Sequence, residues 1–244
     1  MIIAASLFLL SFTAASITGL RAEPWDIGAV ASGGMSFAYG GFFDARDAAL
    51  EELGGQSLDA TGSVSGAVYP SWGAGVFAER YFGRALGMRF ELRPTLLGGA
   101  RAATNDAGQS FDRYSLGCYA LLLPIYLRAR IPAGSGSMVF GLGPELGLVL
   151  GSPTLTETTS AGTSSAAVNQ SPLDGGFVGL SGGGGYQWRG GTGSVSVELR
   201  ADWAVSSASL SWYSGSGAGI VGGSFNPIAV CLAVSYGLGA GGGR

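Results

Sequence analysis

The feature that most constrains this chain is a strict alternation of apolar and polar residues, clearest between Leu86 and Pro94. The apolar positions there are Leu86, Met88, Phe90 and Leu92, and the residues between them are glycine, arginine or glutamate. A period of two predicts a β-strand with one oily face and one charged face. The alternation recurs in roughly eight segments, which is typical of a closed barrel whose outer face meets lipid.

The composition agrees with a lipid environment. Charged residues make up 12% of the 244 residues, about half the usual quarter, whereas apolar residues make up 47% and glycine occupies 45 positions. A surface so poor in charge is poorly solvated by water. The net charge of −3 is too small to indicate a nucleic-acid partner, so we expect none.

The N-terminus predicts export. Residues 2–20 form an apolar stretch that ends before Arg21 and the small residue Ala22, which together indicate a cleaved signal peptide over residues 1–22. The alternative is an uncleaved membrane helix, because nineteen mildly apolar residues could span a bilayer. We expect the barrel domain to cover residues 23–238 and a flexible glycine-rich tail to cover residues 239–244.

The sequence predicts an all-β fold, an eight-stranded antiparallel up-and-down transmembrane β-barrel. The expected strands are 25–39, 69–82, 86–99, 114–131, 138–150, 177–188, 194–206 and 225–238. The connections alternate between short ones (83–85, 132–137 and 189–193) and longer ones (40–68, 101–113, 151–176 and 207–224). Short turns at one end and long loops at the other are the outer-membrane arrangement.

Three further expectations concern loops and aromatic residues. Residues 44–53 have the capping pattern of a short helix, and the Thr- and Ser-rich segment 152–172 is expected to be an irregular, mobile loop. Aromatic residues near strand ends fit girdles at the two membrane interfaces. These residues are Trp25, Tyr39, Tyr69, Trp72, Tyr81, Phe82, Tyr186, Trp188 and Tyr236.

Four runs of residues carry a resemblance to a known family. They are Gly75–Tyr81, Arg89–Pro94, Leu122–Arg130 and Phe140–Gly147. Together they resemble the PorT-like outer-membrane β-barrel proteins, and the architecture is similar to OmpA- and OmpX-type barrels. The resemblance implies an integral barrel in the outer membrane of a diderm bacterium, in contact with its lipid and inserted by the barrel-assembly machinery. Members of such families differ in role, so the resemblance does not fix a function.

If the apolar faces meet lipid, the opposite positions point into the lumen. Five arginines and five acids then face inward, with no net charge: Glu79, Arg89, Glu91, Arg93, Arg128, Arg130, Glu145, Glu198, Arg200 and Asp202. The interior of an eight-stranded barrel is just wide enough for side chains to fill. Because unpaired buried charge is costly, we expect these groups to pair with one another or with water.

Inward-facing glycines leave space in this lumen. They include Gly141, Gly143, Gly147, Gly179, Gly183 and Gly185. The space could be occupied by arginine stems or by Phe77, or could remain as a small cavity.

The sequence gives little support to an enzymatic function. The chain contains no His, so the GxSxG match at residues 179–183 lacks the base and the strand-to-helix turn that a nucleophile elbow needs. The GxGxxG match at residues 217–222 lacks a surrounding βαβ unit. Glu91 with Glu145 is the remaining candidate for acid/base chemistry, although arginine partners favour ordinary ion pairs. We therefore expect no enzyme activity.

The sequence suggests no metal and no cofactor. Cys118 and Cys231 lie far apart, without CxxC or Cys/His spacing, and therefore suggest neither a metal site nor a disulfide framework.

Three functions remain open. The favoured one is a non-enzymatic structural or surface-interaction protein with a largely filled, salt-bridged lumen, whose long loops could contact a surface partner. The alternative is a narrow channel or a binder of a small polar solute that uses the Arg/Glu lumen. The third is a soluble lipocalin-like carrier, which requires inverted faces with Arg89, Glu91 and Arg93 outside.

Overall fold

The computed structural model describes residues 23–40, 63–83, 85–104, 110–159, 162–167, 175–191, 193–213 and 220–240. Within these ranges the regular secondary structure is β-strand. The strands are β1 (Trp25–Tyr39), β2 (Ser63–Ala67), β3 (Tyr69–Phe82), β4 (Leu86–Thr104), β5 (Ser110–Ala133), β6 (Gly136–Thr159), β7 (Gly162–Ala167), β8 (Gly176–Gly190), β9 (Gly193–Ala204), β10 (Ala208–Tyr213) and β11 (Ile220–Ala240).

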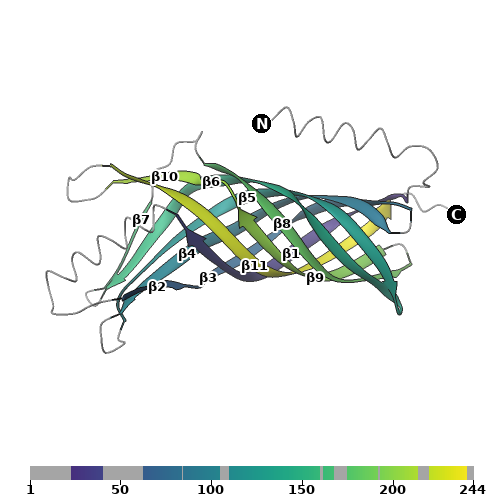
Figure 1. Ribbon diagram of the computed structural model, residues 1–244, viewed down its shortest axis with the longest axis horizontal. Coiled ribbons are helices and arrows are strands. Elements are labelled where there is room, and N and C mark those ends of the chain that lie inside the picture. Colours follow the sequence, from purple (N-terminus) through teal and green to yellow (C-terminus); the bar gives the residue numbers. More distant parts are fainter. Residues whose placement is uncertain are drawn as a thin grey trace.

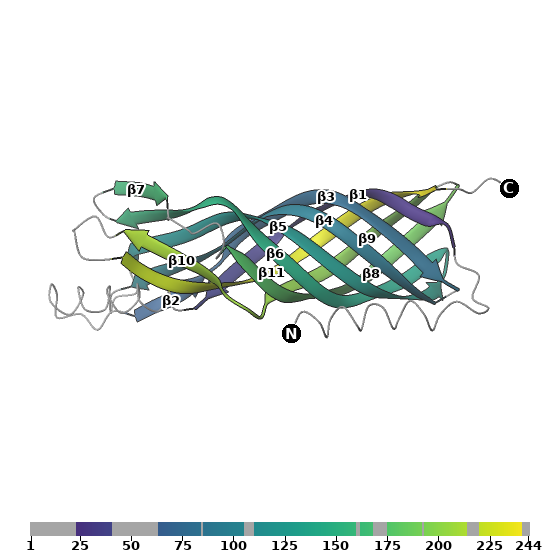
Figure 2. The same ribbon diagram turned by 90° about the horizontal axis from the view of Figure 1, so that it is seen from above.

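The long strands close into one antiparallel barrel. Neighbours follow the order β1, β3, β4, β5, β6, β8, β9 and β11, and β11 returns to pair with β1. The closing register runs from Trp25 opposite Ala240 to Tyr39 opposite Asn226. Each strand of the ring thus has two neighbours, which satisfies the backbone groups without water. The predicted eight-stranded up-and-down barrel is confirmed, and Figures 1 and 2 show it as a long cylinder of tilted strands.

Tight turns lie at one end of the cylinder, which we call the turn side. They join β3 to β4, β5 to β6 and β8 to β9, and each contains a glycine with positive φ: Gly83 (74°), Gly134 (57°) and Gly191 (58°). Such left-handed backbone favours glycine, which has no Cβ to clash. The start of β1 and the end of β11 lie at this same end.

The opposite end, the loop side, contains more strand than the sequence predicted. β2, β7 and β10 gather there, at the left of Figures 1 and 2, and pair with β4, β6 and β11 respectively. The expectation of an irregular loop over 152–172 is therefore wrong for 152–159 and 162–167, which belong to β6 and β7. Residues 220–222 of the GxGxxG match likewise lie in β11.

The physical reason is the height of the barrel. A membrane-spanning strand needs roughly 9–11 residues, whereas β5 and β6 have 24 each. Their loop-side portions therefore rise beyond the bilayer, where the outer face meets water and needs no apolar alternation. Thr154, Thr156 and Thr158 favour strand structure but give this part of β6 no apolar face. A search for alternating apolar residues therefore does not find it.

Several predicted segments fall outside the described residues. These are the signal peptide over 1–22, the short helix over 44–53 and the last four residues of the tail. Gly239 and Ala240, which the sequence assigned to the tail, continue β11 and pair with β1. In the described ranges, no helix has the length and apolar character needed to cross a bilayer.

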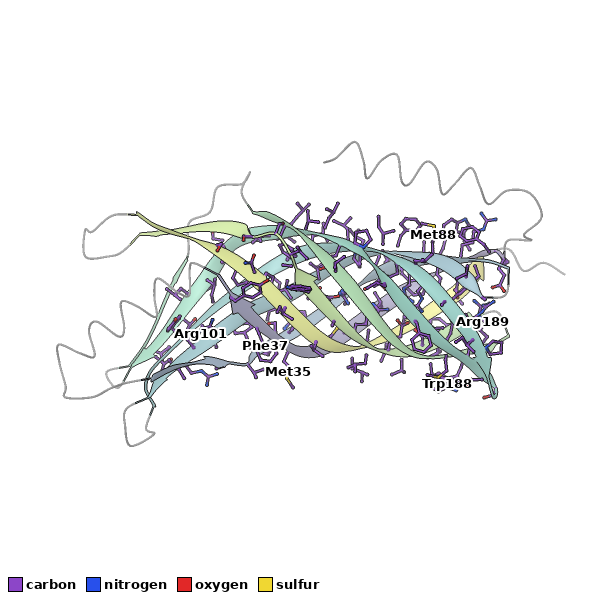
Figure 3. All side chains as sticks on the ribbon, in the orientation of Figure 1. Met35, Phe37, Met88, Arg101, Trp188 and Arg189 are labelled. Atoms are coloured by element: carbon purple, nitrogen blue, oxygen red, sulfur yellow. The ribbon has the colours of Figure 1, made fainter. Side chains whose placement is uncertain are left out.

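The outer surface of the ring is apolar. Met35 and Phe37 project outward from β1 in Figure 3, with exposed fractions of 50% and 40%. The other strands also expose large apolar side chains, among them Leu86, Leu92, Leu127, Leu142, Leu199 and Leu232. Water does not solvate such a continuous surface, whereas hydrocarbon does. The exterior is that of a barrel that spans a membrane.

Aromatic side chains mark both edges of this surface. Trp25, Trp188 and Tyr236 are exposed at the turn side, and Tyr39, Trp72 and Trp203 are exposed at the loop side. Trp203 Nε1 donates a hydrogen bond of 3.0 Å to the Tyr39 hydroxyl. Two belts of aromatic residues, one at each edge, are typical of a barrel at the two membrane interfaces.

One predicted member of these girdles is wrong. Tyr81 is only 1% exposed, because its position in β3 has the inward parity shared with Phe77 and Glu79. It belongs to the interior.

Candidate functional site

The ten charged residues predicted to face the lumen are all buried, and none is more than 8% exposed. Arg89 and Arg93 are fully buried, and Glu91 is 5% exposed. Their burial contradicts the soluble-carrier interpretation, which required these three side chains to face outward.

Glu198 of β9 is the centre of the charged interior. Arg128 donates to both of its carboxylate oxygens, at 2.6 and 3.0 Å, and Arg200 donates through Nε and Nη2 at 3.3 and 3.2 Å. The Ser196 hydroxyl adds a bond of 2.7 Å. Charge-assisted bonds of this kind are the strong class of hydrogen bond, so Glu198 ties β5 to β9 across the lumen.

Arg89 and Glu91 of β4 extend this connection. Arg89 donates to Glu91 at 2.6 Å and to Glu79 of β3 at 3.2 Å, and its guanidinium lies 3.8 Å from the centre of the Phe77 ring. Arg200 donates to both oxygens of Glu91 at 2.9 Å. We call Glu79, Arg89, Glu91, Arg128, Glu198 and Arg200 the lumen network. It links four strands through the middle of the barrel.

A second line of polar groups lies beside the lumen network. Arg93 Nη2 donates to Asp202 at 2.7 Å, the Ser181 hydroxyl donates to the other Asp202 oxygen at 2.5 Å, and the Tyr126 hydroxyl lies 2.7 Å from Ser181 Oγ. Ser181 is the serine of the GxSxG match, yet it lies within the extended strand β8. The geometry is therefore that of a structural hydrogen-bonded line and lacks the turn of a nucleophile elbow.

Arg130 lies at the turn-side rim and binds a residue that the sequence reasoning did not include. Its Nη atoms donate to Glu23 at 2.6 and 3.2 Å, and Arg189 donates to the same carboxylate at 2.8 Å. The Tyr81 ring lies 4.1 Å from the Arg130 guanidinium carbon. We call Glu23, Arg130, Arg189 and Tyr81 the turn-side clasp.

The clasp crosses the mouth of the barrel. Glu23 precedes β1, whereas Arg130 belongs to β5 and Arg189 to β8, the two neighbours of the strand opposite β1 in the ring. Partial burial works against ionisation of Glu23, but hydrogen bonds and charge from the two arginines outweigh it and lower the pKa of the carboxyl. Glu23 thus stays ionised at neutral pH and links the segment before β1 to β5 and β8 at the turn side.

The predicted balance of five arginines and five acids needs correction. Asp26, on the inward parity of β1, is 8% exposed and accepts a bond of 2.5 Å from Ser194, while Arg130 is committed to the rim. Asp26 and Arg130 are equally exposed, so the buried charges of the described ranges number six carboxylates against five arginines. The alternation of residues 25–39 was sufficient to predict that Asp26 faces inward, because Asp26 lies opposite the apolar face.

Inward glycines make room for arginine stems, as one of the sequence-based alternatives supposed. A Cβ at Gly141 would lie 3.1 Å from Arg128 Cδ, and a Cβ at Gly183 would lie 2.9 Å from Arg200 Cγ. Gly147 is covered instead by the ring of Phe177. A larger side chain at Gly141 or Gly183 would displace the arginine side chain that packs against it.

The loop-side half of the interior is apolar, which the sequence did not reveal. Its buried cluster contains Ala38, Leu97, Tyr114, Leu116, Cys118, Ala120, Leu122, Leu155, Phe177, Ala204, Ala208, Phe225 and Ala229. Here both faces of a strand are apolar, as in β5, where Leu122 is fully buried and Tyr119 is half exposed. Without alternation, the inward face has no distinct pattern.

A narrow crevice marks the boundary between the charged and apolar halves. It leaves no free space for a water-sized molecule. It is lined by Leu97, Glu145, Phe177, Asp202, Ala204, Pro227 and Ala229. Among the described residues, Glu145 has no ion pair and no hydrogen bond, and its buried Oε2 has no partner. The expected arginine partner of Glu145 is therefore not found there.

In the described ranges, no group of three or more His, Cys, Asp or Glu side chains is arranged to hold a metal ion. Cys118 and Cys231 are buried free thiols.

No protein-family model and no curated protein sequence matches the chain. Among solved structures, the chain is similar to the outer membrane protein OprG from Pseudomonas aeruginosa, with 10% identity and a TM-score of 0.49 over 91% of this chain and 99% of that chain. It is also similar to Ail, the attachment invasion locus protein of Yersinia pestis, with 10% identity and a TM-score of 0.35 over 88% of this chain and 99% of that one. Similarity at this level transfers no activity.

Proposed function

We propose that this chain is a non-enzymatic protein of the outer membrane of a diderm bacterium, with a structural or surface-interaction role and a lumen filled by its own side chains. One observation carries the proposal, namely an apolar exterior wrapped around a cross-linked charged interior. A soluble protein would place these two surfaces the other way round.

The orientation and the family belong to the same proposal. The tight turns, the start of β1 and the end of β11 would face the periplasm after cleavage of residues 1–22. The long connections would face the exterior, where they could bind a surface partner. The PorT-like relationship rests on the strand motifs between residues 75 and 147. The same relationship would make the barrel-assembly machinery a partner of this chain during its insertion into the membrane.

The geometry favours a filled barrel over an open pore. The lumen network crosses the middle, the ion pairs of the turn-side clasp cross one mouth, and the crevice beside Glu145 has no room for a water molecule. Conduction would require several charge-assisted bonds to break together, each of them stronger than an ordinary hydrogen bond.

Conductance measurements distinguish the filled barrel from the channel alternative. The full-length protein, purified in detergent with heat-dependent gel mobility as the sign of a folded barrel, is inserted into planar bilayers. We expect no steady unitary conductance. A steady conductance that changes in Arg93→Ala would contradict the filled barrel and establish the channel, because Arg93 lies inside the lumen.

A further inference from the structure

Arg80 is the exception on the outer face of the barrel. Its position in β3 lies between the buried, inward-facing Glu79 and Tyr81, so its side chain leaves the strand on the lipid side. It lies opposite Met88 of β4, which is labelled near the turn-side end in Figure 3. The other outward positions in the described parts of β1, β3 and β4 carry no charged side chain. Arg80 is therefore an isolated cation on an apolar surface.

Two contacts fix the direction of this side chain. Arg80 Nε donates a hydrogen bond of 3.1 Å to the carbonyl oxygen of Glu23, and the guanidinium carbon lies 5.7 Å from the centre of the Trp25 ring. The centre of the Trp25 ring lies 6.4 Å from that of Phe90. We call Trp25, Arg80, Met88 and Phe90 the outer arginine patch. Its guanidinium is held against an aromatic surface and is ordered before a ligand binds.

Arg80 has donor capacity that the described residues do not use. Its contacts with them are the Nε hydrogen bond and the Trp25 ring, which leaves the two Nη atoms. The carboxylates of these strand ends are engaged elsewhere, because Glu23 is bound by other arginines and Asp26 and Glu79 are buried in the lumen. A cation that faces lipid without a counter-charge is costly. Arg80 therefore gains from an anion that comes from outside the described part of the chain.

The position of Arg80 indicates which anion fits. Trp25, Trp188 and Tyr236 form the turn-side aromatic belt, and such belts lie at the level of the lipid headgroups. The phosphate of a phospholipid lies at that level, and a guanidinium can donate to two of its oxygens at once. The surface around Arg80 is apolar, with Leu86 at 55% exposure, and suits the acyl chains of the same lipid. A free anion gains nothing from that apolar surface.

We propose that the outer arginine patch binds the phosphate of one phospholipid in the leaflet at the turn side. The two Nη groups of Arg80 donate to phosphate oxygens, and Met88 and Phe90 contact the lipid next to its headgroup. The same arginine holds the Glu23 carbonyl, so the lipid site adjoins the turn-side clasp. The inference needs a barrel that spans a membrane and goes beyond the role proposed above.

A lipid titration followed by native mass spectrometry of the full-length protein in detergent tests this site. The probe is palmitoyl-oleoyl phosphatidylglycerol. Diacylglycerol with the same chains lacks the phosphate, and inorganic phosphate lacks the chains. We expect one tightly bound phosphatidylglycerol per chain and roughly tenfold weaker binding by Arg80→Gln, because the charged, bidentate donor is lost.

Arg113→Gln is the matched control for this titration. Arg113 is an exposed arginine next to the buried Tyr114 in the loop-side part of β5, and it lies outside the outer arginine patch. Its replacement removes one surface arginine and should leave the affinity for phosphatidylglycerol unchanged.

A second variant keeps the test decisive if Arg80→Gln does not fold. Trp25→Leu retains the charge and an apolar side chain but removes the ring that orients the guanidinium, so it should weaken binding about threefold. The proposal is overturned if the wild type retains no lipid or if a folded Arg80→Gln or Trp25→Leu binds as tightly as the wild type. It is also overturned if diacylglycerol or inorganic phosphate binds as tightly as phosphatidylglycerol.

Discussion

The two halves of the interior solve the same packing problem in opposite ways. On the turn side, arginines and carboxylates fill the lumen and are held by the bonds of the lumen network. On the loop side, Leu116, Leu122 and Phe225 fill it by contact alone. The difference teaches that a narrow barrel can be closed by directional ion pairs or by shape, and that these two solutions fail in different ways when one side chain is changed.

The largest expected effect is the loss of Glu198, the centre of the charged half. Glu198→Gln should lower the free energy of unfolding by about 3–5 kcal/mol, because it removes the bidentate partner of the buried Arg128 and leaves Arg200 with Glu91 alone. The measurement is urea unfolding in lipid vesicles, followed by tryptophan fluorescence.

Glu145→Gln is the matched control for that experiment. Glu145 has no ion pair among the described residues, so neutralising it should leave stability unchanged or raise it. Equal losses in the two variants would show that the charged half does not depend on its bonding pattern.

The apolar half should respond to a cavity instead. Leu122 is fully buried, and Leu122→Ala should cost about 3 kcal/mol through lost burial and an unfilled cavity. Leu127→Ala, on the lipid face of the same strand, should cost about 1–2 kcal/mol because lipid chains fill the space. Urea unfolding at low and high salt measures both variants. If the loss of unfolding free energy in Leu122→Ala depended on salt, electrostatic interactions would contribute to the apolar half as well. The distinction between the two halves would then fail.

The smallest effect concerns the turn-side clasp and depends on pH. Because the pKa of Glu23 is lowered in the folded protein, its pairing with Arg130 and Arg189 stabilises the barrel above the ordinary value of 4.5. That stability is lost as pH falls below this value through the folded pKa. Comparing unfolding of the wild type and Glu23→Gln at pH 7 and pH 3 measures it. A difference between the two proteins that is the same at both pH values would exclude the clasp as its source.

Particular residues show how far the sequence reached. The bounds of β1 and β3 and the inward placement of Arg89, Glu91 and Arg93 followed from parity, because a charged residue between two apolar ones has one possible direction in a barrel in lipid. β7 was missed because its residues are small or polar, and a strand above the bilayer needs no apolar face. The partner of Arg130 was missed because Glu23 lies outside any alternating segment and reaches across the ring.

The sequence by itself determined the number of membrane strands, their outer faces and the charges that must lie inside, because a lipid exterior allows each strand only one apolar direction. Only the tertiary structure decided which acid meets which arginine, since those pairs join strands that lie far apart in the chain and depend on the ring's register. It also decided that the loop-side interior is apolar and that Glu145 has no partner among the described residues. Both depend on distances across the lumen that a one-dimensional pattern does not contain.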